Sequence, residues 1–295
     1  MPITRQSETG VLRRVLLKHP RAAWRSVDTI AAEWKALGYR SPPDLVRGVA
    51  EFDALVGLFQ TFEVEVEFLT EDPRTGMDSI YPRDASIVCD RGVILCRMGK
   101  AARRTEPASQ QSALEHLGLP VIGTISGTGT LEGGDVAWLD QRTLAVGRGY
   151  RTNDEGIRQL REILGSGIEV IEVALPHWRG PRDVFHLMSI LSPVDEDVAL
   201  VYSPLMSVPF REFLVERGTT LVEVPDEEFE SLAGNVLALA PGVCLQLEGN
   251  PVTRGRLETV GMKVHTIQGE EICAKGCGGP TCLTRPLERK ARPPQ

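Results

Sequence analysis

The sequence predicts an α/β fold in which five similar units, each of two strands, a helix and a third strand, form a closed ring. Three observations lead to this prediction. A segment made of an amphipathic helix, a glycine and a short strand recurs five times along the 295 residues. Four pairs of apolar stretches joined by tight polar turns lie between these segments. The apolar stretches left over lie at the two ends of the chain and supply a fifth pair.

The recurring segment is recognised by the spacing of its apolar residues. The first helix is expected over residues 44–59, with one apolar face, and the strand VEVEFL follows it. In the other four units a glycine stands where a helix C-terminus favours a left-handed residue. Asn153 is the expected N-cap of the third helix. Equivalent strand positions lie 43 to 57 residues apart: Val64, Val121, Ile168, Leu221 and Val264.

The apolar pairs between these segments are typical of β-hairpins. Their sequences are ASIVCDRGVILC, VAWLDQRTLAVG, SILSPVDEDVALVY and NVLALAPGVCLQL. The fifth pair is expected to join Val11 to Lys18 (VLRRVLLK) with Cys282 to Leu287 (CLTRPL). This closure assigns residues 1–288 to a single domain and leaves 289–295 as a disordered tail. The alternative is a pair of ordinary α/β domains, which the length alone would suggest.

Composition and charge restrict the class of protein. With 42% hydrophobic and 25% charged residues, the chain is typical of soluble globular proteins. A net charge of −7 argues against a nucleic-acid partner. The longest uncharged run, residues 231–247, contains Gly, Asn and Pro and is too short for a membrane helix.

The N-terminal sequence and the cysteines indicate a cytoplasmic protein. Arg13 and Arg14 interrupt the first apolar run, so no secretory signal is expected. The six cysteines are then expected to be reduced thiols. No nucleic acid or membrane is expected as a partner, and a homodimer is left open.

Polar residues stand directly before the apolar hairpins. In a ring of repeats, the same end of every inner strand points to a common centre, so these residues are expected to meet there. Each alone has an ordinary structural explanation, such as a satisfied core histidine or an inert cysteine. Together they supply a nucleophile, an acid and base, and carboxylates: Asp84, Glu132, Asp135, His186, Asn235 and Cys282.

A metal site is not expected. Cys273, Cys277 and Cys282 are close in sequence, but they are spaced by four and five residues and no histidine lies among them. Structural zinc sites use tighter pairs. No other cofactor is expected either.

Four short segments, DSIYPRDASIV, LEGGDV, HLMS and PTCLT, occur in this order. They resemble the motif set of the guanidine-modifying superfamily, which includes dimethylarginine dimethylaminohydrolases, arginine deiminases and glycine amidinotransferases. The resemblance extends from VLLKHP to the last cysteine motif and is closest to the dimethylargininases. It implies the pentein fold, a five-bladed α/β propeller, and a small guanidino compound as the substrate.

The resemblance also implies roles for single residues. Cys282 matches the nucleophile, His186 the general acid and base, and Glu132 the carboxylate that contacts the guanidinium beside His186. The remaining matches are a second guanidinium partner, a contact to the substrate amine and two arginines that clamp the substrate carboxylate: Asp84, Asp78, Arg103 and Arg151. Asp135, from the same motif as Glu132, is counted with the substrate-binding residues.

The expected chemistry follows from the guanidinium group. Carboxylates hold its plane by charge-assisted hydrogen bonds, and a thiolate adds to its central carbon. A bound cation also lowers the pKa of a neighbouring thiol, so the substrate would help to activate its own nucleophile. His186 would protonate the leaving amine, which gives a covalent S-alkylthiouronium, and then activate water.

Two positions depart from the dimethylargininase pattern or from its relatives. Arg83 precedes Asp84, as in deiminases and amidinotransferases, whereas dimethylargininases commonly have Glu there. Met188 stands two residues after His186, where those two groups have Asp, and an apolar side chain there could accept N-methyl groups. The sequence favours a hydrolase of arginine or N-methylated arginine that makes citrulline and an amine. An arginine deiminase, an amidinotransferase and a catalytically silent binding protein are the alternatives.

One further segment is a candidate cover for the site. Residues 21–43 are rich in Trp and Pro, which is typical of a loop. Loops that carry such residues next to a pocket often act in binding. We therefore expect this segment to form a lid.

Overall fold

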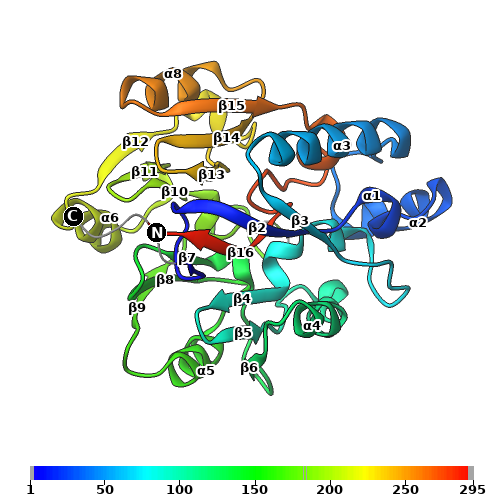
Figure 1. Ribbon diagram of the computed structural model, residues 1–295, viewed down its shortest axis with the longest axis horizontal. Helices are drawn as coiled ribbons and strands as arrows, with labels where there is room; N and C mark the ends of the chain where they lie inside the picture. Colours follow the sequence, from blue (N-terminus) through cyan, green and yellow to red (C-terminus); the bar gives the residue numbers. More distant parts are fainter. Residues whose placement is uncertain (1–2, 182, 184, 292–295) are drawn as a thin grey trace.

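The computed structural model describes residues 3–181, 183 and 185–291. Within these residues the strands form five small sheets of the same construction (Figure 1). Each sheet contains an antiparallel pair of strands, and a third strand joins the second one in parallel after a helix. The predicted repeat of two strands, a helix and a strand is therefore confirmed.

The elements follow one another in this order. The first sheet contains β1 (Ile3–Thr4), β2 (Val11–Leu17), β3 (Glu65–Phe68) and β16 (Arg285–Lys290), with helix α3 (Leu45–Thr61). The second contains β4 (Ser86–Cys89), β5 (Gly92–Leu95) and β6 (Val121–Thr124), with α4 (Glu106–His116). The third contains β7 (Val136–Trp138), β8 (Thr143–Arg148) and β9 (Glu169–Ala174), with α5 (Asp154–Leu164).

The last two sheets repeat the pattern. The fourth contains β10 (Leu191–Asp195), β11 (Val198–Val201) and β12 (Thr220–Glu223), with α6 (Val208–Glu216). The fifth contains β13 (Leu237–Ala240), β14 (Val243–Leu247) and β15 (Lys263–Ile267), with α8 (Pro251–Thr259). The short helix α7 (Asp226–Phe229) connects these two sheets.

The two ends of the chain meet in the first sheet. Strand β16 pairs antiparallel with β2, and Arg285 lies opposite Leu16. The predicted pairing of N- and C-terminal strands is thus confirmed. The strand begins at Arg285 and not at Cys282, because the preceding residues form a turn in which Thr284 Oγ1 donates to the main-chain oxygen of Pro280 at 3.0 Å.

The predicted start of the tail at residue 289 is wrong. Strand β16 continues to Lys290, which pairs with Ile3 of β1. Arg289 is only 1% exposed, and its Nη1 donates to the main-chain oxygens of Gly10 at 2.6 Å and Ala238 at 2.9 Å. These carbonyl groups pair Nη1, and the charge of Glu8 offsets part of the cost of burial, whereas Nε and Nη2 are buried without a hydrogen-bond partner among the described residues. Residues 292–295 of the predicted tail lie outside the described residues.

We expect Arg289→Ala to lower the free energy of unfolding by about 2–4 kcal/mol. The change leaves two buried carbonyl oxygens without a donor and opens a cavity. Urea denaturation measures the loss. Lys290→Ala, in the same strand but half-buried, is the matched control and should cost less than about 1 kcal/mol. Similar losses in both variants would show that Arg289 has no special role.

Helices α3 and α5 are amphipathic, and each is capped by the side chain of the residue before its first turn. Asp44 accepts hydrogen bonds from the main-chain nitrogens of Val46 and Arg47 at the start of α3. Asn153, the predicted N-cap of α5, accepts from Gly156 N at 2.9 Å. The buried faces of these helices cover the sheets, so each unit contributes its own part of the core.

Residues 21–43 are mostly helical, so the predicted loop is wrong. Helix α1 (Pro20–Ala23) is followed by α2 (Val27–Leu37), which Ser26 caps and Gly38 ends at a φ of 86°. Trp24 is fully buried and faces Gly48 of α3, where an added Cβ would lie 2.3 Å from the Trp24 ring. Because the tryptophan is a core residue, its presence did not indicate a loop. Figure 1 shows α1 and α2 at the edge of the molecule, next to α3.

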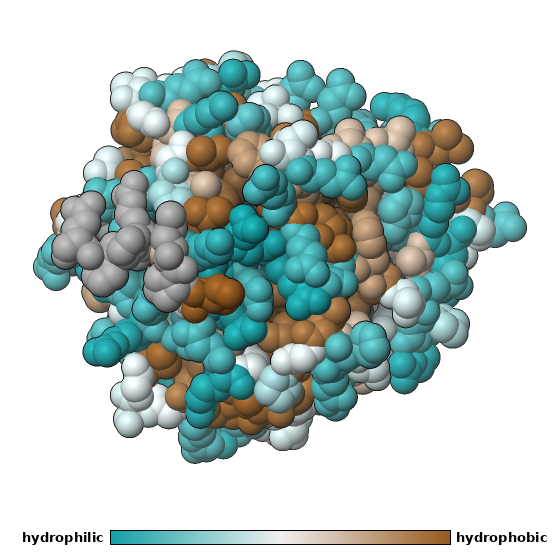
Figure 2. Space-filling model, viewed as in Figure 1, coloured by the Kyte–Doolittle hydropathy of each residue, from teal (hydrophilic) through white to brown (hydrophobic). Residues whose placement is uncertain are grey.

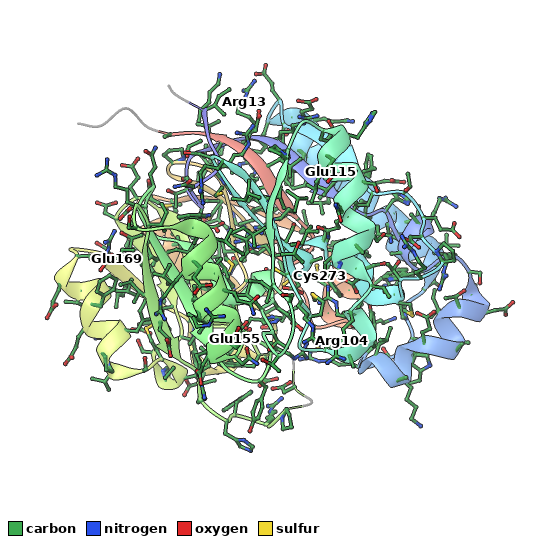
Figure 3. All side chains as sticks on the ribbon, turned by 90° about the horizontal axis from the view of Figure 1, so that it is seen from below. Arg13, Arg104, Glu115, Glu155, Glu169 and Cys273 are labelled. Atoms are coloured by element: carbon green, nitrogen blue, oxygen red, sulfur yellow. The ribbon has the colours of Figure 1, made fainter. Side chains whose placement is uncertain are left out.

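Tight turns precede the inner strands β4, β7, β10, β13 and β16, and they position the polar residues. Three of them are 3₁₀ turns: Pro82–Ala85, Gly133–Asp135 and Leu187–Ser189. In Figure 3 the described ends of the chain lie at the same end of the molecule as Arg13, whereas Arg104 lies at the opposite end. Arg104 directly follows Arg103, one of the predicted site residues. The site therefore lies away from the chain ends.

Among the described residues, no helix is long and apolar enough to cross a membrane. Figure 2 shows hydrophilic side chains over much of the face that carries the chain ends, with apolar residues between them. The apolar segment 231–247 forms a turn and the hairpin of β13 and β14, as predicted.

Candidate active site

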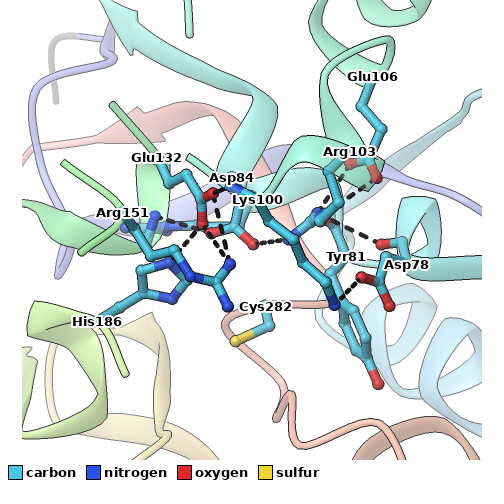
Figure 4. A network of polar contacts seen from close by, with 12 residues as sticks. Asp78, Tyr81, Asp84, Lys100, Arg103, Glu106, Glu132, Arg151, His186 and Cys282 are labelled. Atoms are coloured by element: carbon cyan, nitrogen blue, oxygen red, sulfur yellow. Dashed lines mark hydrogen bonds and ion pairs between the residues drawn. The ribbon is translucent and has the colours of Figure 1, made fainter. Parts of the chain in front are cut away.

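Residues from three of the five turns line one cavity. Asp84, His186 and Cys282 lie in its wall together with Asp78, Lys100, Arg103 and Arg151, and we call this cavity the polar chamber (Figure 4). Glu132 lies behind His186, and its Oε2 is hydrogen-bonded to Nε2 of the imidazole at 2.8 Å. Asn235, from the turn before β13, donates from Nδ2 to Cys282 Sγ at 3.2 Å. The thiol and the imidazole thus face the same cavity.

Glu132 is held by a set of donors in the interior. It is 0% exposed, and besides His186 it accepts from Lys100 N at 2.9 Å and Arg151 Nη1 at 3.2 Å. Burial would raise the pKa of Glu132, but His186 and Arg151 outweigh it and hold the pKa well below its usual value. Glu132 is therefore a carboxylate at neutral pH.

The two glycines after Glu132 are required by close contacts. A Cβ on Gly133 would lie 2.2 Å from the main-chain oxygen of Arg83. A Cβ on Gly134 would lie 2.7 Å from both Asp84 Oδ1 and His186 Nδ1. The EGGD sequence thus lets the backbone pass between the carboxylate and the imidazole.

Asp84 lies next to the thiol and is only partly engaged. Its Oδ2 accepts from Arg103 Nη1 at 2.5 Å, and its Oδ1 accepts from Gly134 N at 2.9 Å. An ionised carboxylate has about four lone-pair sites. Asp84 can therefore still accept hydrogen bonds from a guanidinium group.

The charges around His186 favour its protonated form. Burial alone would lower the pKa of this imidazole, but the carboxylates of Asp84, Asp135 and Glu132 raise it to about 9. His186 is thus positively charged at neutral pH. In this state it can donate a proton to a leaving group in the chamber.

The same surroundings keep Cys282 protonated in the free protein. Burial, and then the charge of Asp84, raise the pKa of the thiol to about 11, against the opposing hydrogen bond from Asn235. A cation bound against Asp84 would remove part of this effect. The thiol is therefore expected to ionise when a guanidinium substrate binds.

We expect Cys282 in the free protein to react slowly with neutral iodoacetamide at pH 7, with a rate that rises about tenfold per pH unit through pH 9. The cationic 2-chloroacetamidine should react at pH 7 at least about tenfold faster. Asp84→Asn removes a negative charge, which lowers the pKa of Cys282, so this variant should react faster with iodoacetamide and slower with 2-chloroacetamidine. The exposed Asp197→Asn is the control. Equal rates in wild type and Asp84→Asn would contradict the role of Asp84.

Arg103 lines the chamber, but its donors point into the protein. Its Nε and Nη2 bind both oxygens of Glu106 at 2.9 and 2.8 Å, and Nη2 also donates to the main-chain oxygen of Tyr81 at 2.9 Å. The role of Arg103 as a clamp for a substrate carboxylate stays a prediction. Glu106, which the motifs did not indicate, has its pKa raised to about 7 by burial, against the charge of Arg103.

Lys100 is a residue of the site that sequence reasoning missed. Its Nζ lies 2.5 Å from Asp78 Oδ2 and 2.6 Å from the main-chain oxygen of Leu37, the last residue of α2. Asp78 is thus in the predicted place, but it is already paired. Lys100 lies in the same GKAARRTE segment as Arg103, and this shared segment was the available signal. The contact with Leu37 also brings the segment 21–43 to the chamber, although as a helix.

Asp135 does not reach the chamber, so its predicted contact with substrate is wrong. It is fully buried, where Oδ2 accepts from Thr152 Oγ1 at 2.6 Å and Oδ1 accepts from Leu187 N at 3.0 Å. Burial raises its pKa to about 6. Leu187 directly follows His186, so Asp135 fixes the turn that carries the imidazole.

A second cavity shares Cys282, His186 and Cys277 with the polar chamber. Its lining includes the aromatic side chains Trp178, Phe185 and Phe229. Arg83 lies at its base, where Nη2 donates to Glu8 Oε1 at 2.6 Å and to Met188 Sδ at 3.0 Å. The two positions that depart from the motif pattern, Arg83 and Met188, are therefore in contact with each other.

Asp84, Glu132 and His186 could also hold a metal ion. One ligand atom from each lies within 4.8 Å of the others. Two carboxylates and an imidazole are a common donor set for divalent cations. The same carboxylates suit a guanidinium group, which needs planar pairs of acceptors.

The comparisons with known proteins agree with this geometry. The family model for eukaryotic N,N dimethylarginine dimethylhydrolase matches residues 43–288. The chain belongs to this dimethylargininase family. The N(G),N(G)-dimethylarginine dimethylaminohydrolase of Streptomyces coelicolor is 31% identical over 225 residues, which cover 74% of this chain and 78% of that protein. The predicted membership of the guanidine-modifying superfamily is thus confirmed.

Arginine deiminases are also similar to this dimethylargininase-family chain. That of Listeria welshimeri is 26% identical over 253 residues, which cover 71% of this chain. The match spans about 61% of the length of the deiminase.

Solved structures of the superfamily show the same α/β fold. A mutant of the dimethylarginine dimethylaminohydrolase from Pseudomonas aeruginosa, in complex with citrulline, has a TM-score of 0.76 at 23% identity and covers 94% of this chain and 99% of that one. The amidinotransferase SxtG from Microseira wollei has a TM-score of 0.80 at 15% identity and covers 100% and 99% of the two chains. At these identities the likeness is one of fold.

Proposed function

We propose that the protein is a cysteine-dependent hydrolase that cleaves a C–N bond of a guanidinium group in an arginine-like compound. Arginine and N-methylated arginine, which would give citrulline and an amine, are the compounds that the motifs favour. The observation that carries the proposal is that Cys282, His186 and Asp84 face one chamber while Glu132 binds His186 at 2.8 Å. The five-bladed closed propeller implied by the motifs belongs to the same proposal.

In the first half of the proposed reaction the thiol adds to the substrate. Asp84 accepts hydrogen bonds from the guanidinium, and this cation lowers the pKa of Cys282. The thiol gives its proton to solvent, and the thiolate attacks the central carbon. His186 donates its proton to the departing nitrogen as the C–N bond breaks. The products of this half are the free amine and an S-alkylthiouronium on Cys282.

In the second half water replaces the sulfur. His186, now neutral, takes a proton from a water molecule whose oxygen adds to the same carbon. The C–S bond breaks, and Cys282 leaves as the thiolate. The product, which still carries a proton on its new oxygen, gives that proton to solvent and leaves as the neutral ureido compound. One water is consumed, and Glu132 keeps the imidazole oriented in both halves.

Product analysis tests the proposal. The protein is incubated with arginine and with NG,NG-dimethylarginine and their shorter or des-amino analogues, and ureido product and released amine are measured. Equal amounts of the two are expected. No ureido product from any compound would contradict hydrolysis, whereas a new guanidino product formed only with added glycine would indicate an amidinotransferase.

We expect turnover to be unaffected by EDTA and by 1,10-phenanthroline, because every step of the proposed reaction is carried out by side chains. The rate of ureido formation is compared before and after dialysis against each chelator. Adding back Zn²⁺ or Mn²⁺ is the control and should not increase the rate. A loss on dialysis that one metal restores would instead assign Asp84, Glu132 and His186 to a metal.

A further inference from the structure

The polar chamber contains an ammonium group of its own. Lys100 Nζ lies between Asp78 Oδ2 and the main-chain oxygen of Leu37, at 2.5 and 2.6 Å. The Lys100 side chain is 20% exposed and that of Asp78 is 7% exposed, so the pair lies in the wall and not on the outer surface. Leu37 ends α2, where the free carbonyl groups form the negative end of the helix. A carboxylate and this carbonyl together form an ammonium site, and Lys100 fills it.

The described lining of the chamber offers one other carboxylate, Asp84. It lies beside Cys282 and already accepts from Arg103 and Gly134 N. In the proposed reaction its remaining lone pairs bind the guanidinium. An ammonium group on the substrate would therefore find Asp78 bound to Lys100 and Asp84 bound to the guanidinium.

The remaining charged groups of the chamber favour an anion. Arg103 and Arg151 line it together with Lys100. A substrate ammonium would have to displace Lys100 Nζ from two short hydrogen bonds. The displaced Lys100 ammonium would then lie next to the substrate ammonium. Like charges in a partly buried site cost several kcal/mol. A substrate carboxylate, in contrast, would be attracted by the positive charges of Lys100 and Arg151, whereas the donors of Arg103 are directed to Glu106, Asp84 and the main-chain oxygen of Tyr81.

We propose that the substrate is a guanidino carboxylic acid without an α-ammonium group. Its guanidinium would lie against Asp84 and Cys282, and its carboxylate would face Lys100 and Arg151. The inference rests on the proposed function, in which the substrate is an arginine-like guanidino compound. Within that class it favours des-amino guanidino acids over arginine itself. Hydrolysis consumes one water and yields a ureido acid and ammonia, or an alkylamine when the guanidino nitrogen is alkylated.

A matched pair of compounds tests the proposal in the wild-type protein. Arginine and 5-guanidinopentanoate have the same chain and differ only in the α-ammonium group, and the NG,NG-dimethyl forms give a second pair. We expect kcat/KM for ureido formation to be at least about tenfold higher for the des-amino member of a pair. A kcat/KM for the amino acid that equals or exceeds that of its partner would overturn the proposal.

Lys100→Met tests whether this side chain causes the preference. Methionine keeps the length of the side chain but removes the ammonium, which frees Asp78 and Leu37 O for a substrate. The preference for the des-amino acid should fall by about tenfold or more. Lys263→Met, at an exposed position of β15, is the control and should leave the preference unchanged. An unchanged preference in Lys100→Met would overturn the assignment to Lys100.

Labelling with 2-chloroacetamidine separates this proposal from the proposed function. This amidine has no chain that could reach Lys100, so it should alkylate Cys282 equally fast in wild type and in Lys100→Met, which also shows that the variant is folded. If Cys282 is labelled but kcat/KM shows no preference for the des-amino acids, only the proposed substrate class is overturned. Absence of labelling, together with no turnover of all four compounds, would overturn the proposed function as well.

Discussion

Cys282→Ser is expected to lower kcat by a factor of about 10,000 or more while the protein stays folded. A serine hydroxyl has a much higher pKa than a thiol, so it does not supply the nucleophile that adds to the guanidinium carbon. The substitution removes no buried apolar group, and Asn235 can donate to the new hydroxyl. Ureido formation and the thermal unfolding temperature are measured together.

A second cysteine gives the matched control for this experiment. Cys89 lies buried at the far end of β4, outside the lining of both cavities, and Cys89→Ala should leave turnover unchanged. Comparable turnover in Cys282→Ser and in wild type would show that another group attacks the substrate. A comparable loss in Cys89→Ala would point to a general loss of structure.

His186→Ala is expected to lower kcat by about 1,000-fold. The variant lacks both the acid that protonates the leaving nitrogen and the base that activates water. The loss should be larger for arginine-type compounds than for substrates with a good leaving group such as an S-alkylthiourea, because those leave without a proton. Single-turnover experiments should then show rapid release of thiol followed by very slow ureido formation.

His177→Ala is the control for the imidazole. His177 lies outside the polar chamber and contacts Tyr150, so its loss should leave both phases unchanged. Near wild-type turnover in His186→Ala would refute the assignment of the acid and base.

The positions of Cys282 and His186 could be predicted because they follow the repeat. Each residue stands before an inner strand, and the helix-and-strand pattern places all inner strands around one centre. The EGGD segment was recognisable as a short motif. Its glycines are needed where the backbone after Glu132 passes close to the imidazole of His186. Local periodicity and short motifs were thus enough for the centre of the site.

The wall of the chamber could not be predicted in the same way. Lys100 reaches Leu37, and Arg83 reaches Glu8, through contacts between segments that have no common pattern. Asp135 and Glu132 belong to one motif, yet Glu132 binds the imidazole of His186 whereas Asp135 binds Thr152. Such differences depend on side-chain direction, which residue spacing does not specify.

Burial of charge was the second source of error. Arg289 was assigned to a frayed tail because charged residues near a terminus are usually solvated. Its side chain is instead buried, with Nη1 bound to two main-chain oxygens and Glu8 close enough to favour its charge. The helix of residues 27–37 was missed because the Trp and Pro residues of the segment 21–43 were interpreted as typical of a loop. Trp24 is instead a buried core residue that packs against α3.

The most direct test of the account is the mass of the protein during turnover. A reaction with the best substrate is quenched in acid within one turnover and digested, and the peptides are mapped by mass spectrometry. The account predicts an adduct on Cys282 that carries the guanidino carbon, absent from Cys282→Ser and increased in His186→Ala. Full turnover with no adduct on Cys282, or an adduct on Cys277 instead, would contradict it.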